Sequence, residues 1–354
     1  FAKDRVQYPF GYGLSYTSFK ESAPVISYDI DGISAQVQVT NTGDLAGKQV
    51  IQMSVTPPQG KLGKPLRNLV AFAKTTLLEP GQVQELVLHA DDYAFASYDD
   101  SGVTGHPYCY VLEAGEYEIY VGTDVRSARK AGSFTVEETM VIARHRQALA
   151  PIRAFTRMKA TEGPEGLALT YEDAPLRKYH IYDRMRDELP LGISTTGDRG
   201  YKLADVYDGR ITLEAFVAQM SQERLCEIVR GEGMNSARVT TGTAAAFGGV
   251  SDGLNAMGIP AGCCSDGPSG IRMDCGTYAF SLPNGTCLAC TFNEELNEAL
   301  YAFEGAELRK NHIDSLLGPG MNLHRHPLNG RNFEYFSEDP HLTGKMAAAQ
   351  LRGM

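Results

Sequence analysis

Several features are missing from this 354-residue sequence, and each absence excludes a class of protein. No Lys/Arg-rich run is interleaved with aromatic residues, and acidic residues outnumber basic ones by 43 to 33, so the cationic surface of a nucleic-acid-binding protein is missing. Charged residues interrupt every apolar stretch well before the ~20 residues that a transmembrane helix needs. Tryptophan is absent. The sequence therefore predicts a soluble protein with neither nucleic acid nor a membrane as partner, and its length indicates two or three domains at ~150 residues each.

Cysteine is present, but not in the pattern of a disulfide framework. There are seven cysteines, an odd number, in a chain too large to need covalent stapling. We therefore expect free thiols in a reducing compartment, and hence a cytoplasmic location. Cys287 and Cys290 form one CxxC, a spacing found in zinc and redox sites, but no second CxxC or His pair lies at finger-like spacing. The favoured interpretation is that these cysteines are small hydrophobic core residues, with a metal or dithiol role as the alternative.

The first residues do not look like a native start. The chain opens Phe1-Ala2-Lys3-Asp4, without Met and without the basic and apolar segments of a signal peptide, so we expect a cut end. Over residues 8–19 glycines alternate with aromatic residues, which is typical of a tightly turning loop whose rings pack on something larger.

A period of two dominates the chain from about residue 25. Alternating residues 33–39, the turn-forming residues 41–44 and a second apolar run over 50–55 predict a hairpin with one buried face. Further strands are predicted at Asn68–Lys74, Gln82–His89 and Tyr117–Val121. About seven short strands in this stretch are typical of a β-sandwich, so residues 20–138 are predicted to form an immunoglobulin-like or fibronectin-type sandwich.

The remainder divides into a linker and an α/β region. Residues 139–200 show no sustained periodicity, and we interpret them as an ordered linker. Thr212 and Ser221 are predicted N-caps of two short helices. Beyond them, strand candidates alternate with helices, which predicts a parallel sheet covered by helices. The strand candidates are 247–250, 261–265, 285–290 and 315–321, and the helices are Glu294–Lys310 and Leu342–Gly353.

Polar residues concentrate directly after two strand candidates, where α/β enzymes place their sites. The first segment runs from Ser265 to Arg272 and combines a carboxylate, Asp266, with a guanidinium on a Gly/Pro-rich loop. Asp accepts hydroxyl hydrogens and Arg donates to oxygens, so the pair suits a polyhydroxylated neutral ligand. The alternative is structural, with Asp266 capping the turn and Arg272 pairing with it.

The second segment, 318–340, is unusually polar and rigid. His324 and His326 share a face if the segment is extended, which would suit a metal, but no third ligand is identifiable. Dinucleotide binding is disfavoured because Gly318-Pro319-Gly320 lacks the third glycine and the proline removes an amide. Between the two segments, residues 280–286 are interpreted as a packing wall for the neighbouring loop.

Three motifs together resemble the N-terminal barrel domain of glycoside hydrolase family 3, the family of many β-glucosidases and β-xylosidases. They are DGPSGIR (266–272), FSLPNGTCLACTFN (280–293) and GPGMNLHRHPLNGRNFEYFSEDP (318–340). PFGYGLSYTSF (9–19) resembles the segment where that family's α/β sandwich domain passes into a fibronectin type III-like domain. VTNTGDLAGKQVIQMSV (39–55) and EAGEYEIYVG (113–122) are similar to strands of the latter.

The resemblance implies an inverted domain order. In the commonest order the barrel comes first, whereas here the fibronectin-like domain precedes it, as in one subgroup of β-glucosidases. Residues 1–19 would be the C-terminal tail of an α/β sandwich domain, 20–138 the fibronectin III-like sandwich, 139–200 a linker and 201–354 the N-terminal part of a (β/α)8-type barrel. The expected fold class is therefore multidomain, an all-β sandwich followed by the first part of an α/β, TIM-like barrel.

The resemblance also assigns roles to single residues. Asp266, Arg272 and Arg331 match positions that bind hydroxyls of the non-reducing-end sugar in subsite −1. The family's nucleophile is an Asp in a Ser/Thr-Asp-Trp motif, which this Trp-free chain lacks, and its Lys-His pair would fall beyond Met354. The acid/base Glu comes from the α/β sandwich domain. We therefore expect no catalytic residue in this chain, and neither a metal nor another cofactor.

Length agrees with a partial barrel, because residues 210–354 fall well short of the roughly 250 that a closed eightfold barrel needs. Half a barrel should be stable only beside its remaining strands. The sequence thus predicts part of a retaining exo-β-glycosidase, foremost a β-glucosidase acting on terminal β-D-glucosyl residues of a β-glucoside or oligosaccharide. Its partner would be the remainder of the same enzyme, and a homo-oligomer is left open.

Two alternatives remain. In the first, the enzyme class is the same, but the substrate is a xyloside, an arabinoside or an N-acetylglucosaminide. Asp266 favours instead a sugar with free 4- and 6-hydroxyls. Otherwise, if the chain is complete, it is a non-catalytic carbohydrate-binding or scaffold protein whose fibronectin-like domain does the binding.

Overall fold

The computed structural model describes residues 6–163 and 166–354. Residues 1–5, where the predicted tail 1–19 begins, and residues 164–165, inside the predicted linker, lie outside the described residues. The chain divides into two compact units, the first ending at Asp187 and the second beginning at Glu188.

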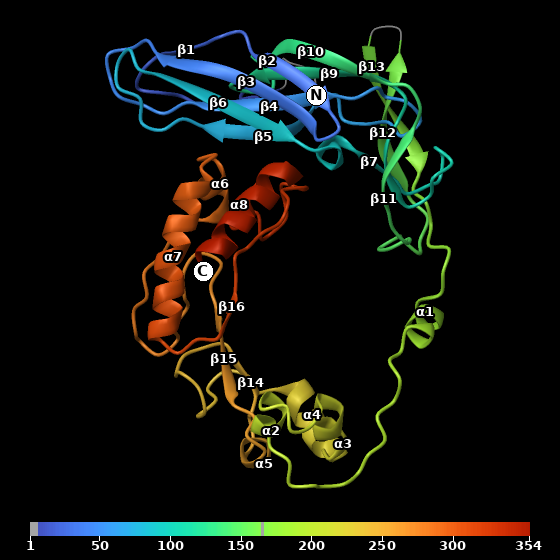
Figure 1. Cartoon of the computed structure of the whole chain (residues 1–354), viewed down its shortest axis with the longest axis vertical. Coiled ribbons are helices and arrows are strands. Elements are labelled where there is room, and N and C mark those ends of the chain that lie inside the picture. Colours follow the sequence, from blue (N-terminus) through green and yellow to red (C-terminus); the bar gives the residue numbers. More distant parts are fainter. Residues whose placement is uncertain (1–5, 164–165) are drawn as a thin grey trace. The chain divides into compact units, whose positions relative to one another are not determined.

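The described part of the first unit consists mainly of antiparallel strands in four sheets, of which the fourth is the two-stranded β12–β13 sheet described below (Figure 1). One sheet contains β1 (Phe19–Glu21), β2 (Val25–Asp29), β3 (Gly32–Asn41) and β6 (Val83–Ala90). The second has the order β10 (Arg129–Val136), β9 (Gly115–Gly122), β4 (Val50–Thr56), β5 (Asn68–Lys74). The third has the order β11 (Met140–Arg144), β8 (Cys109–Leu112), β7 (Ser97–Asp99), with the 3-10 helix η2 (Asp92–Phe95) preceding β7.

One hydrophobic core fills the space between the first two sheets. Along β3, Val37 and Val39 are buried whereas Gln36 and Gln38 are exposed, so the period-two pattern directs one face inward. The core members from β3 and β4 are Ile33, Ala35, Val37, Val39, Ile51, Met53 and Val55, and those from β6 and β9 include Leu86, Leu88, Tyr117 and Ile119. The predicted strands of 20–138 and their sandwich arrangement are confirmed.

The predicted hairpin of residues 33–39 and 50–55 is wrong. β3 pairs with β1, β2 and β6, whereas β4 pairs with β5 and β9, so the two strands belong to different sheets. The turn between them carries the chain from one sheet to the other. Alternation predicts one buried face for each strand, and both faces point into the same core, so the pattern alone does not distinguish a hairpin from a sandwich corner.

Much of the segment interpreted as a linker, 139–200, has regular structure. β11 adds to β8 at the edge of the third sheet. β12 (Thr156–Gly163) and β13 (Gly166–Asp173) form a separate antiparallel hairpin, and α1 (Ile181–Asp187) follows. Lys159 Nζ of the hairpin donates to the Lys61 carbonyl at 2.9 Å, which ties the hairpin to the sandwich. The pairing puts Met158 and Tyr171 on one face of the hairpin and Arg157 and Glu172 on the other. This alternation is short and its apolar face is exposed, so the pattern did not indicate strands of a core.

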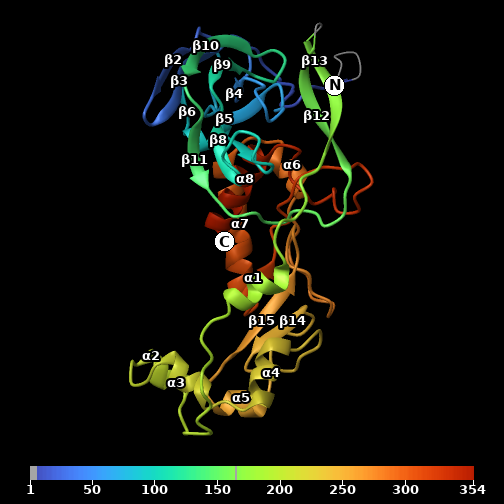
Figure 2. The same cartoon turned by 90° about the vertical axis from the view of Figure 1, so that its right-hand side faces the viewer.

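The second unit combines helices of 5 to 17 residues (Figure 2) with one three-stranded sheet, in which β14, β15 and β16 are neighbours in that order (Figure 1). Its elements are α2 (Leu203–Tyr207), α3 (Leu213–Ala218), α4 (Gln222–Arg230), β14 (Ala245–Gly248), α5 (Asp252–Ala256), β15 (Ala261–Asp266), α6 (Gly285–Ala289), α7 (Glu294–Lys310), β16 (Ser315–Leu317) and α8 (Pro340–Gly353). Thr212 and Ser221 accept backbone N–H bonds at the starts of α3 and α4, which confirms both predicted N-caps. In the described part of the chain, no helix has both the length and the apolarity to span a bilayer.

Two expectations for this unit need correction. The predicted strand 285–290 is the helix α6, because Asn284 accepts from the Cys287 N–H and caps a helix there. The sheet is parallel only between β15 and β16, whereas β14 and β15 are antiparallel. Only α5 lies between the antiparallel strands β14 and β15. The parallel strands β15 and β16 are separated by α6 and α7, because a parallel pair needs a longer crossover connection.

Candidate sugar-binding site

The carboxyl ends of the parallel strands β15 and β16 carry the first predicted residue. Asp266 is the last residue of β15 and is paired in register with Leu317, the last residue of β16. In α/β folds, loops that follow the carboxyl ends of parallel strands form ligand sites. The two motif segments 266–272 and 318–340 begin at this common edge, so the sheet itself brings them together.

The loop after β15 folds back on itself and places Arg272 next to Asp266. The Arg272 N–H donates to the Asp266 carbonyl at 2.8 Å, and the fully buried Ser265 donates from Oγ to the Arg272 carbonyl at 3.0 Å. Gly267 has φ of +143°, and a Cβ there would overlap the carbonyl oxygen of Gly270. The loop therefore requires glycine, and its closure fixes the spacing of the two charged side chains.

Arg272 lies between two carboxylates. Its Nε is 3.1 Å from Asp274 Oδ1, whereas its Nη1 is 3.8 Å from Asp266 Oδ2. All three side chains are more than a third exposed, so neither ion pair contributes much to stability. The alternative that Arg272 serves as the structural partner of Asp266 is thus weakened, because Asp274 is the nearer carboxylate. The sequence did not single out Asp274 as the partner of Arg272. Its only signal was its position, two residues after the arginine.

Arg331 is presented by a compact turn that polar contacts hold in place. Thr286 of α6 donates from Oγ1 to the Tyr335 carbonyl at 2.6 Å. The Nε2 of His324 lies 3.0 Å from the Asn332 carbonyl oxygen and 3.1 Å from that of Tyr335. His324 therefore shapes the turn, and its Nε2 is engaged by backbone oxygens.

The three predicted residues line one open pocket of about 560 Å³. Its lining consists of Asp266, Arg272, Asp274 and Arg331 together with the less polar Met234, Gly242, Ala244 and Leu317. Two carboxylates accept hydrogen bonds, two guanidinium groups donate them, and the apolar residues offer a surface for C–H groups. Such a pocket suits a small neutral molecule with several hydroxyl groups.

The segment 280–286 packs against the first loop, as the sequence predicted. The Leu282 N–H donates to the Ser269 carbonyl at 2.9 Å, and Ser281 Oγ donates to the same oxygen at 3.4 Å. A Cβ at Gly270, whose φ is +117°, would lie 2.5 Å from the Phe280 carbonyl oxygen. This wall therefore fixes the back of the loop that carries Asp266.

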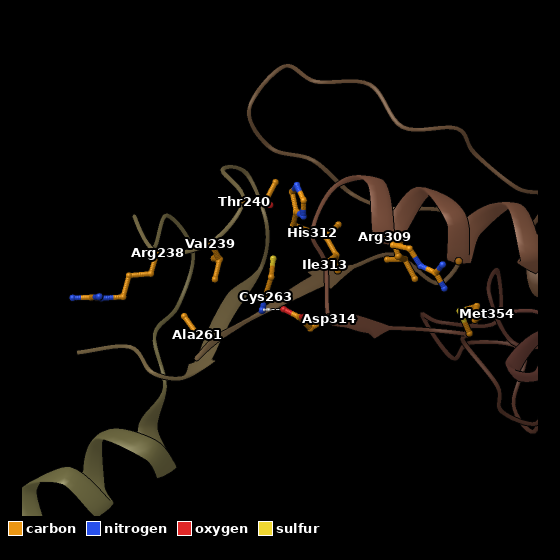
Figure 3. A pocket seen from close by; sticks show the side chains of 12 residues that line it. Arg238, Val239, Thr240, Ala261, Cys263, Arg309, His312, Ile313, Asp314 and Met354 are labelled. Carbon is orange, nitrogen blue, oxygen red and sulfur yellow. Dashed lines mark hydrogen bonds between the residues drawn. The ribbon is translucent and has the colours of Figure 1, made fainter. Parts of the chain in front are cut away.

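A larger pocket of about 750 Å³ lies at the amino ends of the same strands (Figure 3). Cys263 of β15 donates its N–H to Asp314 Oδ2 at 2.7 Å there, and Arg238 is engaged by Asp252. None of the three predicted residues lines it. Within residues 6–163 and 166–354, no group of three or more His, Cys, Asp or Glu side chains is arranged to hold a metal ion.

Comparison with known proteins relates both units to one group of enzymes. A profile of the Fibronectin type III-like domain matches residues 49–125. A Beta-glucosidase of Ruminococcus albus is 54% identical over 354 residues, and Beta-glucosidase A of Butyrivibrio fibrisolvens is 35% identical over 391 aligned residues. Each match covers 100% of this chain, but only 37% and 46% of those proteins.

A solved structure matches in the same way. The beta-glucosidase from Paenibacillus barengoltzii superposes with a TM-score of 0.94 at 51% identity, covering 99% of this chain and 39% of that protein. The chain therefore spans less than half the length of each of these relatives. The alignments run through both units of the chain.

Proposed function

We propose that this chain is the sugar-binding part of a retaining exo-β-glucosidase. The similarity to β-glucosidases, which extends over nearly the whole chain, supports the proposal. Its substrate would be a β-glucoside or oligosaccharide with a terminal non-reducing β-D-glucosyl residue. The pocket that gathers Asp266, Arg272 and Arg331 at the carboxyl ends of β15 and β16 supports the proposal most directly. In line with it, residues 201–354 would be the first part of a (β/α)8-type barrel.

In this proposal the chain binds and orients the sugar, and other parts of the enzyme break the bond. A retaining glycosidase uses one carboxylate as nucleophile and a second carboxyl group as acid and then base. Asp266 would accept from sugar hydroxyls, while Arg272 and Arg331 donate to hydroxyl oxygens. Together they would hold the anomeric carbon against the nucleophile, so that binding energy from the hydroxyls favours the distorted transition state.

The proposal can be tested in a completed enzyme, in which this chain replaces the matching segment of the Paenibacillus barengoltzii β-glucosidase. We expect hydrolysis of p-nitrophenyl β-D-glucopyranoside, and a rate on p-nitrophenyl β-D-xylopyranoside that is lower. Asp266→Asn should remove most of this activity, whereas Glu214→Gln, an exposed carboxylate on α3, should leave it unchanged. A folded completed enzyme that hydrolyses neither substrate, or an unaffected Asp266→Asn variant, would contradict the proposal.

A further inference from the structure

Behind the pocket lies a carboxylate that does not line it. Glu334 has a side chain only 2% exposed, and its Oε1 pairs with Nε of Arg331, whose side chain is 63% exposed. We infer that Glu334 is a positioning residue, which holds the Arg331 guanidinium in the orientation that binds the sugar. The inference rests on the proposed function and extends it to a group that touches no substrate.

The contacts of Glu334 place it where the two pocket loops meet. A Cβ on Gly320 would lie 3.0 Å from Glu334 Oε2 and 3.1 Å from Pro268 Cβ, so the carboxylate packs beneath the junction of segments 266–272 and 318–340. The Oε2 atom is buried and has no hydrogen-bond partner among the described residues. Such a burial is costly for a carboxylate, and the adjacent guanidinium is what offsets it.

The geometry explains how a buried group orients an exposed one. A free arginine side chain samples many rotamers, and ordering it costs conformational entropy. With Nε engaged by Glu334, the four remaining N–H groups on the two Nη atoms stay available at the pocket. Arg272 repeats this arrangement, since its Nε is held by Asp274 at 3.1 Å. The difference is that Asp274 itself lines the pocket and Glu334 does not.

A double-mutant cycle in the completed enzyme tests the inference. Glu334→Gln preserves the shape but removes the charge, and we expect kcat/KM to fall on the order of 10- to 100-fold. In an Arg331→Ala background the same substitution should have no further effect, because its action passes through Arg331. Arg331→Lys keeps the charge without an Nε–H donor and should lose about as much as Glu334→Gln. Glu338→Gln, an exposed carboxylate of the same segment, is the matched control.

The outcomes separate this inference from the proposed function. If Glu334→Gln keeps full activity, or lowers it by the same factor with and without Arg331, the positioning role is wrong. An Arg331→Lys variant with full activity also overturns it, even where Glu334→Gln is too unstable to purify. If Asp266→Asn leaves hydrolysis unchanged in the same experiment, the proposed function itself fails. A positioning role further requires that Glu334→Gln changes kinetics with little change in the melting temperature.

Discussion

The two units differ in how completely they satisfy their own buried groups. The sandwich encloses one core shared by its two four-stranded sheets. The α/β unit instead has several small apolar clusters around a three-stranded sheet, among them those centred on Leu254, Cys263 and Leu288. Within the described residues, most buried side-chain atoms that lack a hydrogen-bond partner also belong to the α/β unit, including those of Glu304, Glu334 and Gln350.

Two buried carboxylates make the difference concrete. In the sandwich, Glu113 pairs with Lys64 Nζ at 2.6 Å and accepts the Lys61 N–H at 2.8 Å. In the α/β unit, Glu304 on α7 is fully buried, and neither carboxylate oxygen has a hydrogen-bond partner in the described structure. The sandwich thus satisfies its buried carboxylate Glu113, whereas the described part of the unit with the candidate site contains more groups without a partner than the sandwich does. This is the pattern expected of a scaffold next to a functional region.

The largest expected effect tests whether function belongs to the α/β unit. Asp266→Ala in the completed enzyme should lower kcat/KM on the order of 10³-fold, about 4 kcal/mol, because in the proposed function the carboxylate accepts hydrogen bonds from sugar hydroxyls. Steady-state kinetics on p-nitrophenyl β-D-glucopyranoside gives the value. Stability should change little, since the Asp266 side chain is 42% exposed. A near-parental kcat/KM would remove Asp266 from the site and break the comparison.

The second effect concerns Glu113, the buried carboxylate of the sandwich that pairs with Lys64. Glu113→Gln should destabilise the sandwich by about 3 kcal/mol, because it leaves the 3% exposed Lys64 ammonium without its charge partner. Burial already lowers the pKa of Lys64, which Glu113 partly offsets. Thermal unfolding followed by circular dichroism would show the loss, with the exposed Glu79→Gln as control. An unchanged melting temperature would mean that the sandwich tolerates an unpaired buried charge.

The third substitution, Glu304→Gln, should increase stability at high pH, where Glu113→Gln decreases it. Burial, with a smaller contribution from Glu307, raises the pKa of Glu304 from 4.5 to about 7. The folded chain therefore keeps this carboxyl protonated at pH values where the unfolded chain ionises it. The contribution of Glu304 to stability is fully present below about pH 4.5 and is lost up to about pH 7, by as much as about 3 kcal/mol.

Glu304→Gln should remove that decline, so the variant is more stable than the parent at pH 8 and similar at pH 4.5. Urea unfolding of the parent and variant completed enzymes across this pH range measures the difference, with Glu295→Gln, an exposed carboxylate of α7, as control. A parent whose stability rises with pH over the same interval would contradict the prediction. It would mean that burial of Glu304 does not dominate the pH dependence, and the contrast with Glu113 would disappear.

The same contrast explains how much could be predicted from the sequence. Strands β3 and β4 were predictable because alternating apolar residues have one interpretation in a sandwich, although the sheet that each strand joins depends on tertiary pairing. The helix α6 was mistaken for a strand because a five-residue apolar run fits both structures, and only the Asn284 cap distinguishes them. The β12–β13 hairpin was missed although its residues alternate, because the alternation is short and its apolar face, with Met158 and Tyr171, stays exposed.

For the site, the motifs identified Asp266, Arg272 and Arg331, which the fold brings to one pocket. The groups that orient the two arginines, Asp274 and Glu334, were not predictable in that role. A carboxylate two or three residues from an arginine is too common to signal an ion pair. Whether it forms one depends on how the loop folds, and here that depends on contacts between segments far apart in the sequence.

The smallest expected effect concerns the attachment of the β12–β13 hairpin. Arg157 joins Asp100 of the sandwich to Glu172 of β13, with Nη2 at 3.0 Å from Asp100 Oδ1 and 2.8 Å from Glu172 Oε1. Because its side chain is 36% exposed, Arg157→Ala should cost only about 1 kcal/mol of stability.

The loss should be local, since the hairpin has no part in the sandwich core. Hydrogen exchange of the β12 and β13 amides should therefore quicken while β3 and β4 amides stay protected. Faster exchange in β3 and β4 as well would mean that the hairpin belongs to the cooperative unit, and that the sandwich is less self-sufficient than its single core indicates.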